Sequence, residues 1–236
     1  MKSMRSIAAI LFILAVPVLL ISANLWLAAT DMRLYEYGFD KHNVTARTGL
    51  DRAELLAVGQ EIVDYFRSDA ELLDSELFGP REIAHMKDVK GLVQLSRTVM
   101  LGAAAYLAAF AVAYLAWKRR TAWHYISRNL VLGSAATIAI LAVLGLWALI
   151  GFENLFLLFH LISFRNDLWQ LSPGDALLRL FPEGFFSDAT LFVAGATVVE
   201  AAIIGTLAWF FSPMRRARSL LKEVEAGSPG QSPGSD

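Results

Sequence analysis

The chain of 236 residues contains no cysteine. Disulfide bonds, thiol nucleophiles and thiolate metal sites are therefore excluded, as is a lipid-modified cysteine on this protein itself. Charged residues are scarce, at 18% of the chain, and the net charge is only −1. This composition does not indicate a surface that binds nucleic acid, so we expect no nucleic-acid partner.

Several motifs of known chemistry are also missing. The chain has no His-Glu-x-x-His, no phosphate-binding glycine loop and no Gly-x-Ser-x-Gly motif. Such motifs are typical of zinc proteases, nucleotide-binding proteins and many serine hydrolases. We therefore expect none of these three chemistries, and we assign no residue as a metal ligand in the leading interpretation.

Long apolar runs dominate what remains. Hydrophobic residues make up 56% of the chain, and four stretches reach the roughly 20 residues that a helix needs to cross a bilayer. The predicted fold class is all-α, a polytopic membrane protein with four transmembrane helices and two structured extracytoplasmic segments. We expect one membrane domain over residues 1–225 and a disordered cytoplasmic tail over 226–236. The predicted spans cover about residues 7–29, 98–117, 130–150 and 189–211.

Basic residues near the span ends predict the orientation. The loop 118–128 and the flank 215–222 each carry four basic residues and no acidic one, whereas segment 152–188 carries two basic and five acidic residues. Because basic residues favour the cytoplasmic side, we expect both termini to be cytoplasmic. Segments 30–97 and 151–188 then face outward.

The first outward segment shows two helix starts. Asp51 and Glu54 have the spacing of a capping box, and apolar residues at helical spacing follow to about Arg67. Gly79-Pro80 marks a second start, since proline suits a first helical turn. We expect that helix to continue through His85 into the second span.

Two histidines, His85 and His160, lie in polar clusters just outside predicted spans. Asp88 and Asp167 follow them within a few residues, and we expect each aspartate to orient one ring. If both clusters face outward, two imidazoles form an acid–base site at the membrane surface. The alternative is that His85 is a surface or packed residue and that Asp88 belongs to a solvated helix face.

Glu200 is the one strong charge in the middle of a predicted span. Intramembrane carboxylates often mark function, so Glu200 is a possible intramembrane polar site. The alternative is a hydrogen bond between helices, to a residue such as Ser134 or Thr137.

The two clusters resemble those of the bacterial lipoprotein intramolecular transacylases. The resemblance covers roughly residues 7–211, with the same four-span arrangement. It rests on Arg81-Glu82-Ile83-x-His85-Met86-x-Asp88-Val89-Lys90, on Phe159-His160 followed by Phe164, Asn166, Asp167 and Trp169, and on Asp175 with Phe181-Pro182-Glu183-x-Phe185-Phe186.

The resemblance implies an enzyme of the bacterial cytoplasmic membrane that acts at the outer leaflet. It implies transfer of the sn-2 acyl chain of a diacylglyceryl-modified lipoprotein to the α-amino group of the N-terminal cysteine, giving a lyso-form lipoprotein. The expected partners are these lipoproteins and membrane lipids. The implied catalytic residues are His85 and His160. We assign substrate binding to Asp88, Lys90, Arg165, Asn166, Asp167 and Trp169.

The chemistry of this reaction needs no cofactor, because the substrate brings both its ester and its amine. A histidine, with a usual pKa of about 6.5, suits deprotonation of an α-ammonium whose pKa is about 7.7–8.0. Two other functions remain open. One is a metal-dependent membrane hydrolase with His85, Asp88, His160 and Asp167 as ligands, and the other is a non-enzymatic four-span scaffold.

The distance between the rings of His85 and His160 distinguishes one shared site from two separate polar clusters. The two spans between His85 and His160 cross the bilayer and return, so their outer ends lie close together. We expect the two rings to meet within about 12 Å, the reach of one reacting centre and its hydrogen-bonding groups. Asn166, Asp167 and Trp169 are expected to line the same cleft, open to the outer leaflet.

Overall fold

The computed structural model describes residues 2–119 and 121–212, and this part of the chain is helical with no strand. The all-α prediction is therefore confirmed. The eight helices of the described residues are α1 (Lys2–Thr30), α2 (Met32–Lys41), α3 (Val44–Thr48), α4 (Arg52–Arg67), α5 (Pro80–Trp117), α6 (Ala122–Ser163), α7 (Ala176–Leu180) and α8 (Glu183–Phe210).

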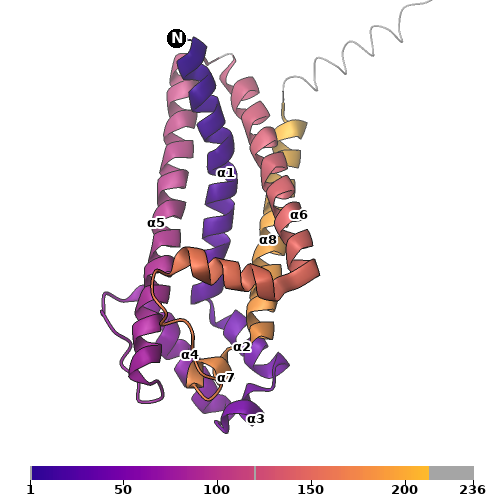
Figure 1. The fold of residues 1–236 in the computed structure, drawn as a ribbon. Coiled ribbons are helices and arrows are strands. Elements are labelled where there is room, and N and C mark those ends of the chain that lie inside the picture. The colour runs from indigo at the N-terminus through magenta and orange to yellow at the C-terminus, as the bar shows by residue number, and fades with distance from the viewer. Residues whose placement is uncertain (1, 120, 213–236) are drawn as a thin grey trace, which may run out of the picture.

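The long helices α1, α5, α6 and α8 pack side by side as a bundle (Figure 1). Each is long and apolar enough to cross a membrane, which confirms the prediction of four spans. Lipid-facing side chains are expected to be apolar, and many large hydrophobic residues on these helices are indeed exposed. The N-terminus and the end of α8 lie at the same end of the bundle (Figure 1). The predicted tail over 226–236 lies outside the described residues.

Helix α5 is longer than a membrane is thick. Its 38 residues extend about 57 Å at 1.5 Å per residue, against about 30 Å for the hydrocarbon core. Residues 98–117 carry no charge, whereas residues 80–97 carry six charged side chains. The apolar part, 98–117, is the part that suits a membrane span, and five charged turns precede it. The helix starts at Pro80, as Gly79-Pro80 predicts.

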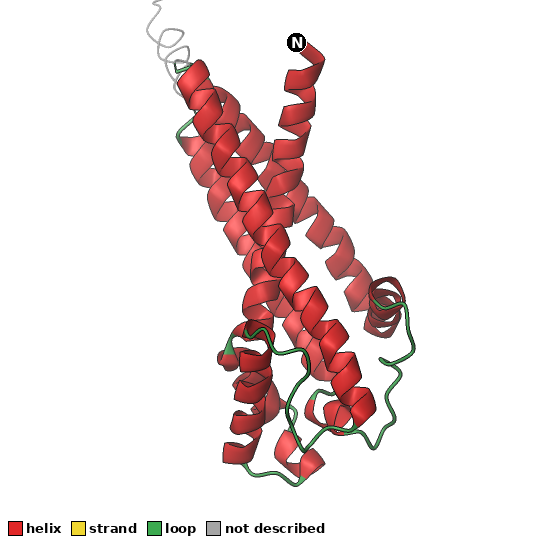
Figure 2. Ribbon diagram, turned by 90° about the vertical axis from the view of Figure 1, so that its left-hand side faces the viewer, coloured by secondary structure: helices red, strands yellow, loops and turns green. Residues whose placement is uncertain are grey.

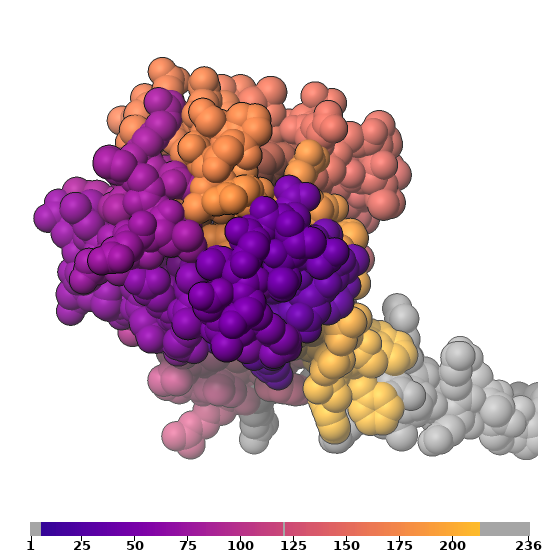
Figure 3. All heavy atoms as spheres, turned by 90° about the horizontal axis from the view of Figure 1, so that it is seen from below, coloured from indigo at the N-terminus to yellow at the C-terminus, as the bar shows by residue number. Residues whose placement is uncertain are grey.

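These first turns belong to a small helical head, formed by α2, α3, α4, α7 and residues 80–97 of α5. The head covers one end of the bundle, opposite the N-terminus (Figures 1 and 3). Asp51 and Glu54 form the predicted capping box at the start of α4. Aromatic side chains from α2, α8 and the segment before α8 pack together in the core of the head, among them Tyr35, Phe39, Phe181 and Phe185.

Helix α6 turns sharply at Gly151, where the backbone leaves helical geometry. The residues after the turn, 152–163, form a crosswise helix that runs across the bundle toward α5 (Figures 1 and 2). Apolar side chains project from this crosswise helix into the surroundings, with exposed fractions of 47–75% for Leu157, Phe159, Leu161 and Ile162. The turn at Gly151 comes directly after the predicted third span, 130–150, and the helix continues beyond it in a new direction.

Glu200 pairs with Asn24 between α8 and α1. The Asn24 Nδ2 atom donates a hydrogen bond of 2.7 Å to Glu200 Oε2, and Asn24 is buried. An interhelical hydrogen bond is thus found, but the suggested partners Ser134 and Thr137 are wrong. The Thr137 hydroxyl donates to the carbonyl of Gly133 within its own helix, and the Ser134 hydroxyl has no partner.

Replacing Glu200 by leucine should lower the thermal stability of the detergent-solubilised protein. Polar pairs between membrane helices contribute about 0.6–2 kcal/mol, so we expect a fall of a few degrees in Tm. Glu200→Gln should stay near the wild type, because its amide oxygen still accepts from Asn24. Equal Tm values for Glu200→Leu and the wild type would show that the pair does not stabilise the bundle.

Candidate active site

His85 and His160 meet where the crosswise helix reaches α5. His85 lies in the second turn of α5, and His160 lies in the last turn of the crosswise helix. Their ring centroids are 6.4 Å apart, and the residues are only 8% and 9% exposed. The expectation that the two rings converge is confirmed. The sharp turn at Gly151 makes this approach possible.

Aromatic rings surround the histidine pair. The His160 ring contacts four of them, with centroid distances of 4.4 to 5.6 Å, and Phe164 also lies 5.1 Å from the ring of His85. Such rings exclude water from the imidazoles and strengthen electrostatic interactions between them and a bound group. The four aromatic neighbours of His160 are Phe156, Phe159, Phe164 and Trp169.

The two imidazoles have different hydrogen-bonding partners. The Nδ1 atom of His160 lies 2.8 Å from the carbonyl oxygen of Phe156, one turn earlier. A carbonyl only accepts, so Nδ1 of His160 carries the proton and Nε2 of the neutral ring holds a lone pair. The Nδ1 atom of His85 is buried without a hydrogen-bond partner. Buried polar atoms without partners are costly and uncommon, and they often point to a functional role.

The expected pairing of an aspartate with each ring is wrong. Asp88 Oδ2 instead accepts a hydrogen bond of 2.8 Å from the side-chain amide of Asn166. The Asp167 carboxylate accepts from Gln170, and its carbonyl oxygen accepts from Arg81. A backbone carbonyl therefore orients His160. Asp88, on α5, instead bonds to the segment that follows the crosswise helix, and Asp167 bonds within that segment.

Of the remaining residues that were predicted to bind substrate, Trp169 lies beside the histidine pair, whereas Arg165 and Lys90 are not shown in contact with it. Trp169 lies beside His160, at a centroid distance of 5.1 Å. Arg165 is exposed. Lys90 is buried on the side of α4, where its ammonium group donates to the carbonyl of Ala70 and lies 4.2 Å from the Tyr65 ring centroid. Lys90 thus holds the segment after α4 against α5.

Glu82 is a residue of the site region that received no role from the sequence. It is 5% exposed, and its two carboxylate oxygens accept from the backbone N–H groups of Gly79 and Leu177. The signal was present, because Glu82 stands three residues after Gly79 at the start of α5, in the capping position. The bond to Leu177 joins segments 95 residues apart, and no local pattern indicates it.

The surroundings of the histidines favour the neutral form of both rings. The side chains lie in the head and in the crosswise helix, outside the predicted spans 98–117 and 130–150. Burial lowers the pKa of His85, and a positive charge on His160 would lower it further, whereas Asp88 acts in the opposite direction. Burial also lowers the pKa of His160, and the bond to the Phe156 carbonyl opposes this shift. A neutral imidazole is the form that accepts a proton.

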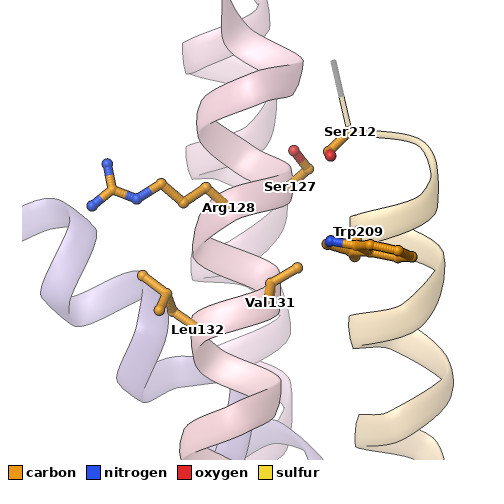
Figure 4. A pocket seen from close by; sticks show the side chains of 6 residues that line it. All are labelled: Ser127, Arg128, Val131, Leu132, Trp209 and Ser212. Carbon is orange, nitrogen blue, oxygen red and sulfur yellow. The ribbon is translucent and has the colours of Figure 1, made fainter. Parts of the chain in front are cut away.

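A metal site and a cavity elsewhere in the bundle are the alternatives to the histidine pair. Among residues 2–119 and 121–212, no group of three or more His, Asp or Glu side chains is arranged to hold a metal ion. A cavity of about 100 Å³ lies between α6 and α8 near Ser127, Trp209 and Ser212 (Figure 4). It sits at the end of the bundle away from the head. Its lining residues are Ser127, Arg128, Val131, Leu132, Trp209 and Ser212, which include no histidine or carboxylate.

Comparison with known proteins identifies the family. The family model of the lipoprotein intramolecular transacylase Lit matches residues 10–186. The chain belongs to this family. A related protein from Aquifex aeolicus, described only as uncharacterised, is 22% identical over 221 residues and covers 86% of this chain and 96% of its own length.

Solved structures of the Lit transacylase from Bacillus cereus share the fold. One has a TM-score of 0.78 at 20% identity, covering 96% of this chain and 100% of the other. A second, in which a histidine is replaced by alanine, has a TM-score of 0.76 at 20% identity, covering 92% and 97%. The four-span bundle with its head is thus shared by Lit proteins of widely different sequence.

The buried histidines should make the protein less stable in mild acid. The unfolded rings have a pKa near 6.5 and the folded rings a lower one, so the unfolded state binds more protons as the pH falls below about 6.5. The contribution of the neutral histidines to stability is fully present above pH 6.5. It is lost progressively as the pH falls from there toward the lowered pKa values of the folded rings. We therefore expect Tm in detergent to fall between pH 7 and pH 5.

The double variant His85→Gln/His160→Gln tests the origin of this decline. It lacks both titrating rings, so its Tm should depend less on pH over the same range. An unchanged pH dependence in the double variant would assign the acid sensitivity to other groups.

Proposed function

We propose that this chain is a lipoprotein intramolecular transacylase in which His85 and His160 act as one catalytic pair. The family assignment supports the reaction class. The observation that carries the site is the approach of two buried imidazoles to 6.4 Å within an aromatic enclosure. The substrate is a diacylglyceryl-modified lipoprotein, and the product carries an acyl chain on its α-amino group.

His160 is the better placed base. Its Nδ1–H is held by the Phe156 carbonyl, which leaves Nε2 as the proton acceptor. A positioned base of this kind typically contributes 10²–10⁴-fold to a rate. His85 has a buried Nδ1 without a partner in the protein, and a neutral imidazole that carries its proton there can donate to the oxyanion of a tetrahedral intermediate.

The transfer then balances without a further reactant. The α-amine attacks the ester carbonyl carbon, a nitrogen–carbon bond forms, and His160 takes the amine proton. Collapse of the intermediate breaks the bond between that carbon and the glyceryl oxygen. The proton returns to this oxygen as a hydroxyl, either directly from His160 or through His85. Because ester and amine belong to one molecule, proximity replaces a protein nucleophile.

The crosswise helix fits a lipid substrate. Its exposed apolar residues continue the apolar surface of the spans and suit acyl chains at the level of the membrane surface. The opposite face of its last turn presents His160 to His85. A substrate held by its chains in the outer leaflet therefore brings its headgroup ester close to both rings.

The other two functions lack support. A metal-dependent hydrolase needs a set of ligands that the described residues do not provide at the histidine pair. A passive scaffold does not account for two imidazoles enclosed by aromatic rings, one of them with an orphaned nitrogen. The Lit family is defined by an enzymatic activity.

Expression in a bacterium without its own Lit should yield lyso-form lipoproteins. Mass spectrometry is expected to find N-acyl S-monoacylglyceryl cysteine at lipoprotein N-termini. His85→Ala and His160→Ala should each reduce this product at least about 100-fold, because each removes an acid–base group. His124→Ala, at the far end of α6, is the matched control and should remain active. Lipoproteins left diacylated by the wild type would contradict the assignment.

The proposed orientation has its own test, made simple by the absence of cysteine. In right-side-out spheroplasts, a membrane-impermeant maleimide should label Glu76→Cys, in the head, but not Thr121→Cys, in the loop at the opposite end. Lysis should make both accessible, and the wild type should remain unlabelled throughout. The reverse pattern would place the histidine pair on the cytoplasmic side.

A further inference from the structure

Glu82 joins the start of α5, the helix that carries His85, to the start of α7. Its Oε2 accepts a hydrogen bond of 2.7 Å from the N–H of Gly79, at the start of α5. Its Oε1 accepts one of 2.8 Å from the N–H of Leu177, in the first turn of α7. A carboxylate at a helix start satisfies unpaired N–H groups and interacts favourably with the helix dipole. One buried side chain therefore accepts hydrogen bonds from the N-terminal ends of both α5 and α7.

The second of these helices belongs to the return segment, residues 164–182, which leads from the crosswise helix to α8. This segment carries Phe164 and Trp169, two of the rings that enclose the histidines. Its other polar ties to α5 run from Arg81 to the Asp167 carbonyl and from Asn166 to Asp88.

The tie through Glu82 differs from these two. The bonds from Arg81 to Asp167 and from Asn166 to Asp88 are exposed, so water competes with them. The bond from Leu177 to Glu82 is buried, and hydrogen bonds to an ionised group are about twice as strong as those between neutral groups. Among the polar contacts between the return segment and α5, the buried bond to Glu82 is therefore the strongest, and it adds to the apolar packing of Leu177 and Leu180 in the head.

We propose that Glu82 is a positioning residue for the acyl-transfer site, holding the return segment, with Phe164 and Trp169, over His85 and His160. This inference rests on the proposed function. Each oxygen of Glu82 accepts from a backbone N–H group, and we assign Glu82 no part in proton transfer. It acts through the geometry of the rings around the imidazoles.

Glutamine at position 82 removes one acceptor, because an amide has a single oxygen and its NH₂ group faces an N–H. Glu54 offers a matched control. It forms the same capping box at the start of α4, where its Oε2 accepts from Asp51 N at 2.7 Å, but it is exposed and reaches no second helix. Glu54→Gln should therefore leave the site unchanged.

The first measurement is kinetic, with purified full-length protein and a synthetic diacylglyceryl lipopeptide. Misplacement of a site by about 1 Å can cost 10²-fold, so we expect Glu82→Gln to lower kcat about 10- to 100-fold with KM changed less than threefold. Glu54→Gln should keep kcat within twofold. A kcat of Glu82→Gln equal to the wild type would overturn the proposal.

The second measurement does not depend on activity. The cysteine pair Asp88→Cys/Asn166→Cys places one thiol on α5 and one on the return segment, in a chain without other thiols. A short bis-methanethiosulfonate reagent should bridge the pair rapidly, more slowly when Glu82→Gln is added, and at an unchanged rate when Glu54→Gln is added. Equal bridging rates in all three backgrounds would also overturn the proposal.

These outcomes separate the positioning role from the proposed function. A wild type without transacylase activity contradicts the function, while slower bridging in Glu82→Gln still supports the placement of the segment. Should Glu82→Gln fail to fold, Glu82→Asp is measured in the same way. It keeps the charge but is one methylene too short to reach both helices, and the same loss of kcat and of bridging is expected.

Discussion

The turn of α6 at Gly151 is the constraint on which the site depends. A straight α6 would carry His160 along the bundle axis, away from the second turn of α5. The turn lays residues 152–163 across the bundle instead and brings the two rings to 6.4 Å. It also produces the two faces of the crosswise helix, one exposed and apolar, the other directed at His85. The return segment begins where the crosswise helix ends, so its rings Phe164 and Trp169 lie beside the histidine pair.

The enclosure of the imidazoles links structure to reactivity. Aromatic rings and burial favour the neutral rings, which makes them acceptors of protons rather than charged surface groups. The same enclosure costs stability in acid, since neutral buried histidines must be protonated on unfolding. In the proposed mechanism, two imidazoles and a dry surface are sufficient. The substrate carries both reacting groups, so the reaction needs only proximity and proton transfer.

The sequence predicted those features that depend on composition and local spacing. Hydropathy located the four spans, and the capping pattern located the starts of α4 and α5. The convergence of His85 and His160 followed from two spans that cross and return. The features that escaped prediction arise from backbone geometry and distant contacts. The direction of the crosswise helix depends on one turn at Gly151, His160 is oriented by a backbone carbonyl, and Glu82 bonds to a residue 95 positions away.

An isotope crossover measurement tests the central claim, direct transfer within one substrate molecule, most directly. Purified protein receives a mixture of two lipopeptides, one with a heavy peptide and light acyl chains, the other with a light peptide and heavy acyl chains. Transfer promoted by the histidine pair predicts N-acylated products in which each peptide keeps its own acyl isotope, with no acyl group bound to the protein. Products that combine heavy peptide with heavy acyl chain, or an acylated enzyme, would contradict the account.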